Sequence, residues 1–210
     1  MGKVSINRPK GHKIYDMKKI IILGIFVLMT MISFAQTQSS EHLAFKGVPI
    51  DGTLNEYIAK MKQSGFTHIG TENGVAMLKG DFASYKDCIV GVATLRQKDL
   101  VSKITVLFPE WDSWSSLASN YFSIKEMLTE KYGEPSQSVE KFQTYAEPKD
   151  DGYKMTLVQS DQCKYFTIYE IEKGSIELSI EHSGLTSFVR LSYYDKINSD
   201  IIKAKAKDDL

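Results

Sequence analysis

The 210-residue sequence is poor in the residues that mark disulfide-rich or proline-rich proteins, with only two cysteines and five prolines. It has no excess of charge, since 26 basic residues balance 26 acidic ones. Hydrophobic residues make up 42% and aromatic residues 11%. This composition excludes collagen-like, coiled-coil and disordered classes. Without a basic excess, we expect no nucleic-acid partner.

Signatures of catalysis and of metal binding are also missing. His42, His68 and His182 do not stand in HxxH, HExxH or HxH spacing, and neither cysteine belongs to a CxxC pair. No GxSxG, SxxK, Walker or GxGxxG element occurs. We therefore predict a protein that is not an enzyme, with no catalytic residue, no metal and no cofactor.

One hydrophobic run stands out, at residues 20–32, after Met17-Lys18-Lys19 and before Ser33-Phe34-Ala35. A basic start, a short apolar stretch and a small-x-small end are typical of a secretory signal peptide. The run is shorter than the roughly 20 residues that span a bilayer. We predict a signal peptide at 17–35 that is cleaved after Ala35, a periplasmic or secreted product, and no stable membrane anchor.

Residues 1–16 are typical of an upstream extension. The sequence is compatible with a translation start at Met1 and with one at Met17. Residues 1–35 hold six basic residues and one acidic residue. The predicted mature chain therefore has 20 basic and 25 acidic residues, a net charge of −5. Phosphate contacts need clustered Lys and Arg, so this charge again disfavours nucleic acid.

The first part of the mature chain, residues 36–110, predicts a strand, a helix and four further strands. Thr53 and Glu56 form a capping box for a helix over 54–64, with Gly65 after its end. Asn73-Gly74 predicts a hairpin turn. The predicted strands are 42–50, 66–70, 75–82, 88–95 and 101–108.

The second part, residues 111–197, predicts a longer helix followed by five strands. Asp112 or Ser113 caps the helix and Gly133 follows it. The predicted strands are 137–146, 153–159, 163–171, 175–182 and 187–195, with 150–152 as a hairpin tip. In the fourth, Ile176, Leu178 and Ile180 alternate with polar residues, so one face meets a core and the other meets water. Residues 198–210 form a C-terminal tail with a short helix.

These two parts follow one plan, which predicts an internal duplication. Phe45 and Pro49 precede the first helix as Phe108 and Pro109 precede the second, and each part places its cysteine on an equivalent strand. We predict an α+β fold, in which each repeat contributes a helix and a four- to five-stranded antiparallel sheet, with the helices packed on one side.

Two cysteines in an exported chain form an even count in an oxidising compartment. If the repeats are related by a pseudo-twofold axis, Cys88 and Cys163 can face each other and form a disulfide. The alternative is two unpaired thiols that behave as small hydrophobic residues.

Aromatic residues are the best candidates for a binding surface. Exposed Trp and Tyr side chains anchor many protein and carbohydrate interfaces. The candidates for ligand or partner binding are Trp111, Trp114, Tyr165, Tyr169 and Tyr193. In the alternative interpretation these rings belong to the core, as most large aromatic side chains do.

Several segments carry a resemblance to a known group of proteins: residues 45–54, Gly80-Asp81-Phe82, and Lys131-Tyr132-Gly133-Glu134-Pro135. The chain resembles uncharacterised secreted proteins of Gram-negative gut anaerobes over nearly its whole mature length. The resemblance implies export and no particular chemistry. The duplicated plan is similar to β-lactamase inhibitory protein and to TATA-binding-protein-like folds, at the level of architecture alone.

Three functions follow from these observations. The first is an exported, non-enzymatic domain that binds a protein or an envelope component. The second is a glycan- or lipid-binding protein with a cleft between the two repeats, near Trp111, Trp114 and Tyr193. The third, a hydrolase with a dispersed site, is the weakest, because no nucleophile–base pair is visible.

Overall fold

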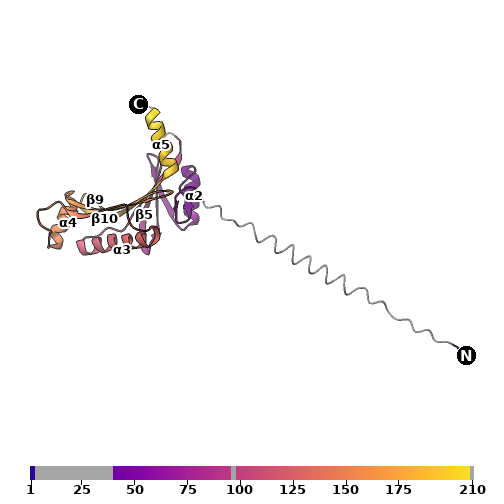
Figure 1. Cartoon of the computed structure of the whole chain (residues 1–210), viewed down its shortest axis with the longest axis horizontal. Helices are drawn as coiled ribbons and strands as arrows, with labels where there is room; N and C mark the ends of the chain where they lie inside the picture. Colours follow the sequence, from indigo (N-terminus) through magenta and orange to yellow (C-terminus); the bar gives the residue numbers. More distant parts are fainter. Residues whose placement is uncertain (3–39, 96–97, 209–210) are drawn as a thin grey trace. The chain divides into compact units, whose positions relative to one another are not determined.

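The computed structural model describes residues 1–2, 40–95 and 98–208, and the chain from Ser40 onward forms one compact unit (Figure 1). The predicted signal peptide and its cleavage site lie outside the described residues, as does nearly all of the predicted extension. The strands are β1 (Ala44–Phe45), β2 (Val48–Pro49), β3 (Thr67–Glu72), β4 (Val75–Phe82), β5 (Tyr85–Leu95), β6 (Leu100–Leu107), β7 (Gln137–Phe142), β8 (Cys163–Ile171), β9 (Gly174–Ser183) and β10 (Thr186–Asp195). The helices are α2 (Leu54–Gln63), α3 (Trp114–Tyr132), α4 (Asp151–Gln159) and α5 (Lys196–Asp208).

The predicted α+β class is wrong, because the protein is mostly β. Within the part of the chain that the structure describes, strands account for about 43% of the residues and helices for about 29%. Eight strands form one antiparallel sheet in the order β3-β4-β5-β6-β10-β9-β8-β7, and β1 with β2 forms a separate two-stranded sheet. The sheet is continuous because β6 pairs with β10, with Val106 opposite Leu191 and Ile104 opposite Tyr193. Sequence patterns do not reveal that β6 will pair with a strand as distant along the chain as β10.

The predicted strand at 153–159 is also wrong, since this segment is helix α4. Tyr153, Met155 and Leu157 alternate as they would on a strand, but Asp150 caps a helix instead. Its carboxylate accepts a hydrogen bond from the Tyr153 N–H at 2.7 Å, which satisfies one of the free donors of the first turn. Met155, Leu157 and Val158 are buried, so the helix replaces the predicted hairpin tip and strand.

Local signals elsewhere are confirmed. Thr53 and Glu56 make both hydrogen bonds of the capping box on α2. Asn73 and Gly74 both have positive φ, at 52° and 78°, which a tight hairpin turn requires.

The single strand predicted at 42–50 differs from the structure. It is broken into β1 and β2 by a turn at Lys46-Gly47, where both residues have positive φ.

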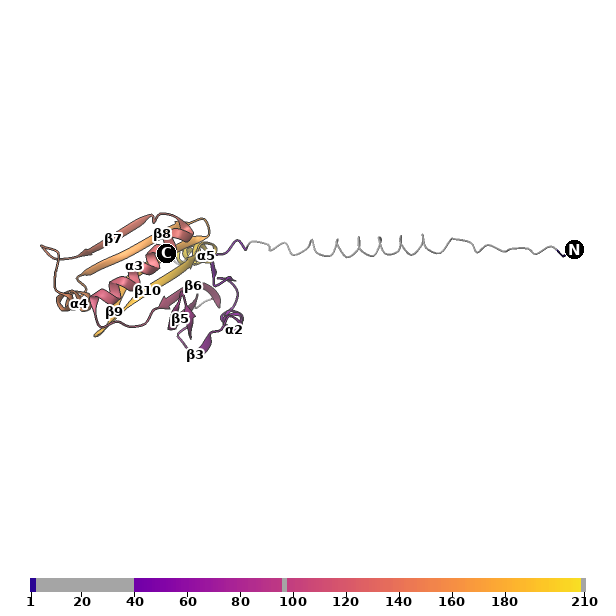
Figure 2. The ribbon, with the colours of Figure 1, turned by 90° about the horizontal axis from the view of Figure 1, so that it is seen from below.

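The sheet has one covered face and one open face. On the covered face a row of buried residues crosses six strands, in the order Leu78, Val90, Val106, Leu191, Leu178 and Thr167. In the second half this face packs on α3, which runs beneath β8, β9 and β10 (Figure 2). Side chains alternate between the faces of a strand, so the next row lies on the other side.

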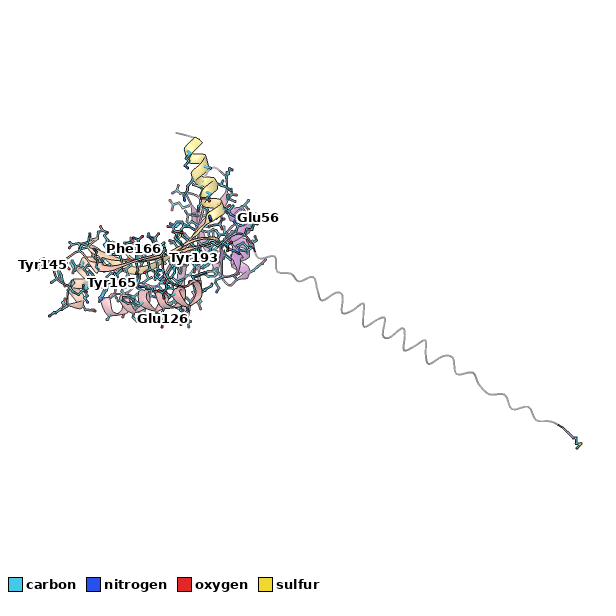
Figure 3. All side chains as sticks on the ribbon, in the orientation of Figure 1. Glu56, Glu126, Tyr145, Tyr165, Phe166 and Tyr193 are labelled. Atoms are coloured by element: carbon cyan, nitrogen blue, oxygen red, sulfur yellow. The ribbon has the colours of Figure 1, made fainter. Side chains whose placement is uncertain are left out.

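That next row defines what we call the open face. It runs through Lys79, Ile89, Leu107, Arg190, Ser179 and Phe166, and all of these but Ser179 are at least partly exposed. Figure 3 shows the division directly: Tyr165 points toward α3, whereas its neighbour Phe166 points to the opposite side. Helix α5 rises from the sheet on the side away from α3 (Figure 1).

Candidate functional site

The aromatic residues predicted for binding lie mainly in the core. Trp114, Tyr165, Tyr169 and Tyr193 are buried, and Trp111 is partly buried against the core. The Trp114 ring contacts those of Phe142 and Tyr165 edge to face, with centroid distances of 4.8 and 5.0 Å. The visible role of the four buried rings is packing, whereas Trp111 stays partly exposed.

Two of these aromatic residues have hydrogen-bond partners within the protein. The Trp111 indole N–H donates to Asn120 Oδ1 at 3.2 Å, and Tyr169 Oη lies 2.9 Å from Thr129 Oγ1. Burial raises the pKa of Tyr165 to about 12 and also raises the pKa of Tyr193. These tyrosines therefore stay neutral near neutral pH.

Both cysteines are free, so the structure contains no bond between Cys88 and Cys163. Cys88 lies on β5 and Cys163 on β8, with three strands between them. At about 4.8 Å per strand, β5 and β8 are roughly 19 Å apart, whereas a disulfide needs a Cα separation below about 7 Å. Burial raises the pKa of Cys88 to about 11 and of Cys163 to about 12. Neutral thiols of this kind are poor nucleophiles.

The histidines of the described residues, His42, His68 and His182, lie apart from one another, and each has a local partner. His68 Nε2 lies 2.9 Å from Thr71 Oγ1, and His182 Nε2 lies 3.2 Å from Asp161 Oδ1. Within the described ranges, no group of three or more His, Cys, Asp or Glu side chains is placed to hold a metal ion.

His42 belongs to a buried network around Asp195, whose side chain is fully buried. Asp195 accepts hydrogen bonds from the Leu43 N–H at 2.8 Å and from the Asn198 N–H at 2.9 Å, and His42 Nδ1 lies 3.0 Å away. Asp51 lies 3.6 Å from the other ring nitrogen of His42. The network joins the segment before β1 to the start of α5, so we read this histidine–carboxylate pair as structural.

The open face carries a cluster of charged side chains at the centre of the sheet. Arg190 on β10 lies 2.8 Å from Glu181 and 3.4 Å from Glu177, both on β9. Ser179 donates to Glu181 at 2.9 Å, and Tyr194 Oη donates to Glu177 at 3.4 Å. Arg190, Glu177 and Glu181 are each about one-third exposed, so the charges are held in place yet reachable from solvent.

A groove of about 510 Å³ lies between the open face and α5. Its sheet side includes Ile168, Glu170, Glu177 and Tyr194, and its helix side includes Lys196, Asp200 and Lys203. A second hollow, of about 270 Å³, shares Glu177 and continues past Phe166, Ser179 and Glu181. The two hollows together follow β8 and β9 along the open face.

Sequence reasoning found part of this site and missed the rest. The alternation of Glu177 and Glu181 with apolar residues predicts a wet strand face, which is where they lie. Arg190 was missed, because only the register of β9 with β10 brings Arg190 opposite Ser179. A C-terminal helix was predicted, but its place as a wall of the groove was not. The predicted cleft residues Trp111, Trp114 and Tyr193 do not line the groove.

No protein-family model, curated protein sequence or solved structure matches this chain. The resemblance to secreted proteins of gut anaerobes, and the likeness in plan to β-lactamase inhibitory protein, stay predictions. In the part of the chain that the structure describes, no helix is long and apolar enough to cross a membrane.

Proposed function

We propose that the protein is an exported, non-enzymatic domain that binds a protein or an envelope component through the open face of its sheet. The observation that carries this proposal is the Arg190 cluster, which lies at the centre of the uncovered side of an eight-stranded sheet. Arginine is enriched among residues that dominate binding energy near interface centres.

Apolar side chains surround this cluster on the same face. Leu107 lies directly opposite Arg190 on β6, Phe188 lies two residues before it on β10, and Phe166 lies two strands away. All three are partly exposed. Arginine and aromatic side chains are both enriched in protein–protein interfaces, so Arg190 beside Phe166 and Phe188 fits a protein-binding surface.

Pre-organisation supports the same function. Because Glu177 and Glu181 already hold the Arg190 guanidinium, little side-chain entropy remains to be lost on binding. Export is supported by the predicted signal peptide alone, and the absence of catalytic motifs supports a binding role.

A small glycan or lipid fragment is a second candidate ligand. The groove beside α5 supports it, since about 510 Å³ lies within the range of small-molecule sites. Its walls carry several charged side chains, which favours a polar ligand over a lipid tail.

Site-specific photo-crosslinking tests the leading function. A benzophenone amino acid replaces Phe166 or Phe188 on the open face and, as control, Phe122, which is 44% exposed on α3. We expect a discrete crosslinked adduct in intact cells from positions 166 and 188 and none from position 122. No adduct from either open-face position, or an equal adduct from position 122, would overturn the proposal.

A further inference from the structure

We propose that the groove between α5 and the open face recognises a peptide segment that carries a basic and an acidic side chain on its two opposite sides. This inference rests on the proposed function and names the chemistry of the partner at one place on the open face. It follows from the distribution of charge across the groove.

The sheet side of the groove is anionic. Glu170 on β8 and Glu177 on β9 both line it, and Glu181 lies further along the same face of β9, in the neighbouring hollow. Arg190 neutralises only part of this charge, since it lies between two of the three carboxylates. A basic side chain would be favoured on this side.

The helix side of the groove is cationic on balance. Lys196 and Lys203 stand two turns apart on α5, with Asp200 between them. Among the described residues, no ion pair joins these lysines to Glu170 or Glu177 across the groove. The two walls therefore hold opposite net charge without neutralising each other.

The floor between the walls is partly apolar. Ile168 and the ring of Tyr194 lie on the open face of β8 and β10, and Lys103 lies 4.7 Å from the Tyr194 ring centroid. In an extended peptide adjacent side chains point to opposite sides. A Lys-Glu pair would therefore place one charge against each wall, while flanking aliphatic side chains contact the floor.

Four capped tetrapeptides of the form Leu-X-Z-Leu test the inference with the purified full-length protein. The central pair is Lys-Glu, Lys-Lys, Glu-Glu or Gln-Gln, and binding is followed by NMR chemical shifts up to about 5 mM peptide, where even millimolar affinity is measurable. We expect the Lys-Glu peptide to bind at least about tenfold more tightly than the others, because like-charge contacts at an interface cost several kcal/mol.

Reversing the charge of one wall should then change which of the four peptides binds most tightly. The double variant Glu170→Lys with Glu177→Lys should prefer the Glu-Glu peptide, and Lys196→Glu with Lys203→Glu should prefer the Lys-Lys peptide. Control variants carry the same charge changes at exposed positions elsewhere: Glu126→Lys with Glu130→Lys on α3, and Lys60→Glu with Lys62→Glu on α2. These controls should retain the original order of affinities.

Equal affinity for all four peptides, no saturable shift with any of them, or an unchanged preference in the wall variants would overturn the inference. Crosslinking from positions 166 and 188 separates this failure from that of the proposed function. If adducts form but the groove shows no preference among the peptides, the open face remains the interface and the groove is not part of it. If the groove prefers the Lys-Glu peptide but no adducts form, the proposed function of binding a protein partner through the open face is wrong.

Discussion

Asp195 illustrates how a single buried carboxylate can hold distant parts of this chain together. Moving an unpaired charge out of water is costly unless hydrogen bonds compensate for it. Here the N–H groups of Leu43 and Asn198 and the ring of His42 supply that compensation. Asp195 also serves as the N-terminal cap of α5, the helix that forms one wall of the groove.

We predict that Asp195→Ala lowers the free energy of unfolding by about 2–4 kcal/mol, since two buried N–H donors lose their acceptor. Urea denaturation measures the change. The matched control is Asp161→Asn, which removes the charge of an 87% exposed carboxylate beside His182 and keeps a residue type that tolerates the positive φ of 60° at this position; it should cost less than about 1 kcal/mol. A similar small loss in both variants would contradict the structural role of Asp195.

The candidate binding residues show that residue type alone does not predict whether an aromatic side chain lies in the core or on the surface. Trp114, Tyr165, Tyr169 and Tyr193 were proposed because large aromatic rings anchor many interfaces, but strand alternation puts Tyr165, Tyr169 and Tyr193 on the covered face. Phe166, Arg190 and Tyr194 occupy the open face for the same reason. A shift of one position along a strand moves a side chain from the core to the surface. The sequence does not show which face of the strand the helices will cover.

At the scale of elements, local signals decided most boundaries correctly. The capping box of α2, the Asn73-Gly74 turn and the end of α3 at Gly133 all act within a few residues. Helix α4 was misread because its apolar residues also alternate. A capping aspartate followed by glycine resembles a turn, and the helix is only nine residues long.

We predict that Asp150→Ala destabilises the protein by about 1 kcal/mol, because the cap of α4 is lost. Lys149→Ala, one residue earlier, is the control and should change stability by less than about 0.5 kcal/mol. Thermal unfolding followed by circular dichroism compares the two. Equal stability of both variants and the wild type would contradict the capping role.

At the scale of the whole molecule, the pairing of β6 with β10 joins the two predicted repeats into one sheet. Leu191 is 1% exposed and lies opposite Val106 and Leu178, so it packs where the two halves meet. A shared central core should make the halves unfold together rather than one after the other.

We predict that Leu191→Ala lowers stability by about 2–5 kcal/mol through the cavity it leaves. Tryptophan fluorescence, which reports on Trp111 and Trp114, and circular dichroism should still give coincident transitions in urea. Leu185→Ala is the control, since that side chain is 83% exposed at a hairpin tip. Two separate transitions in the wild-type protein would contradict a single cooperative unit.

By itself the sequence determined the features that depend on neighbours along the chain: helix caps, tight turns, most strand positions and the signal-peptide pattern. The tertiary structure decided the class, the continuity of the sheet, the separation of Cys88 from Cys163 and the location of the groove. These depend on which strands pair and which face the helices cover. Such contacts form between residues such as Val106 and Leu191, which are far apart in sequence, and local patterns do not encode them uniquely.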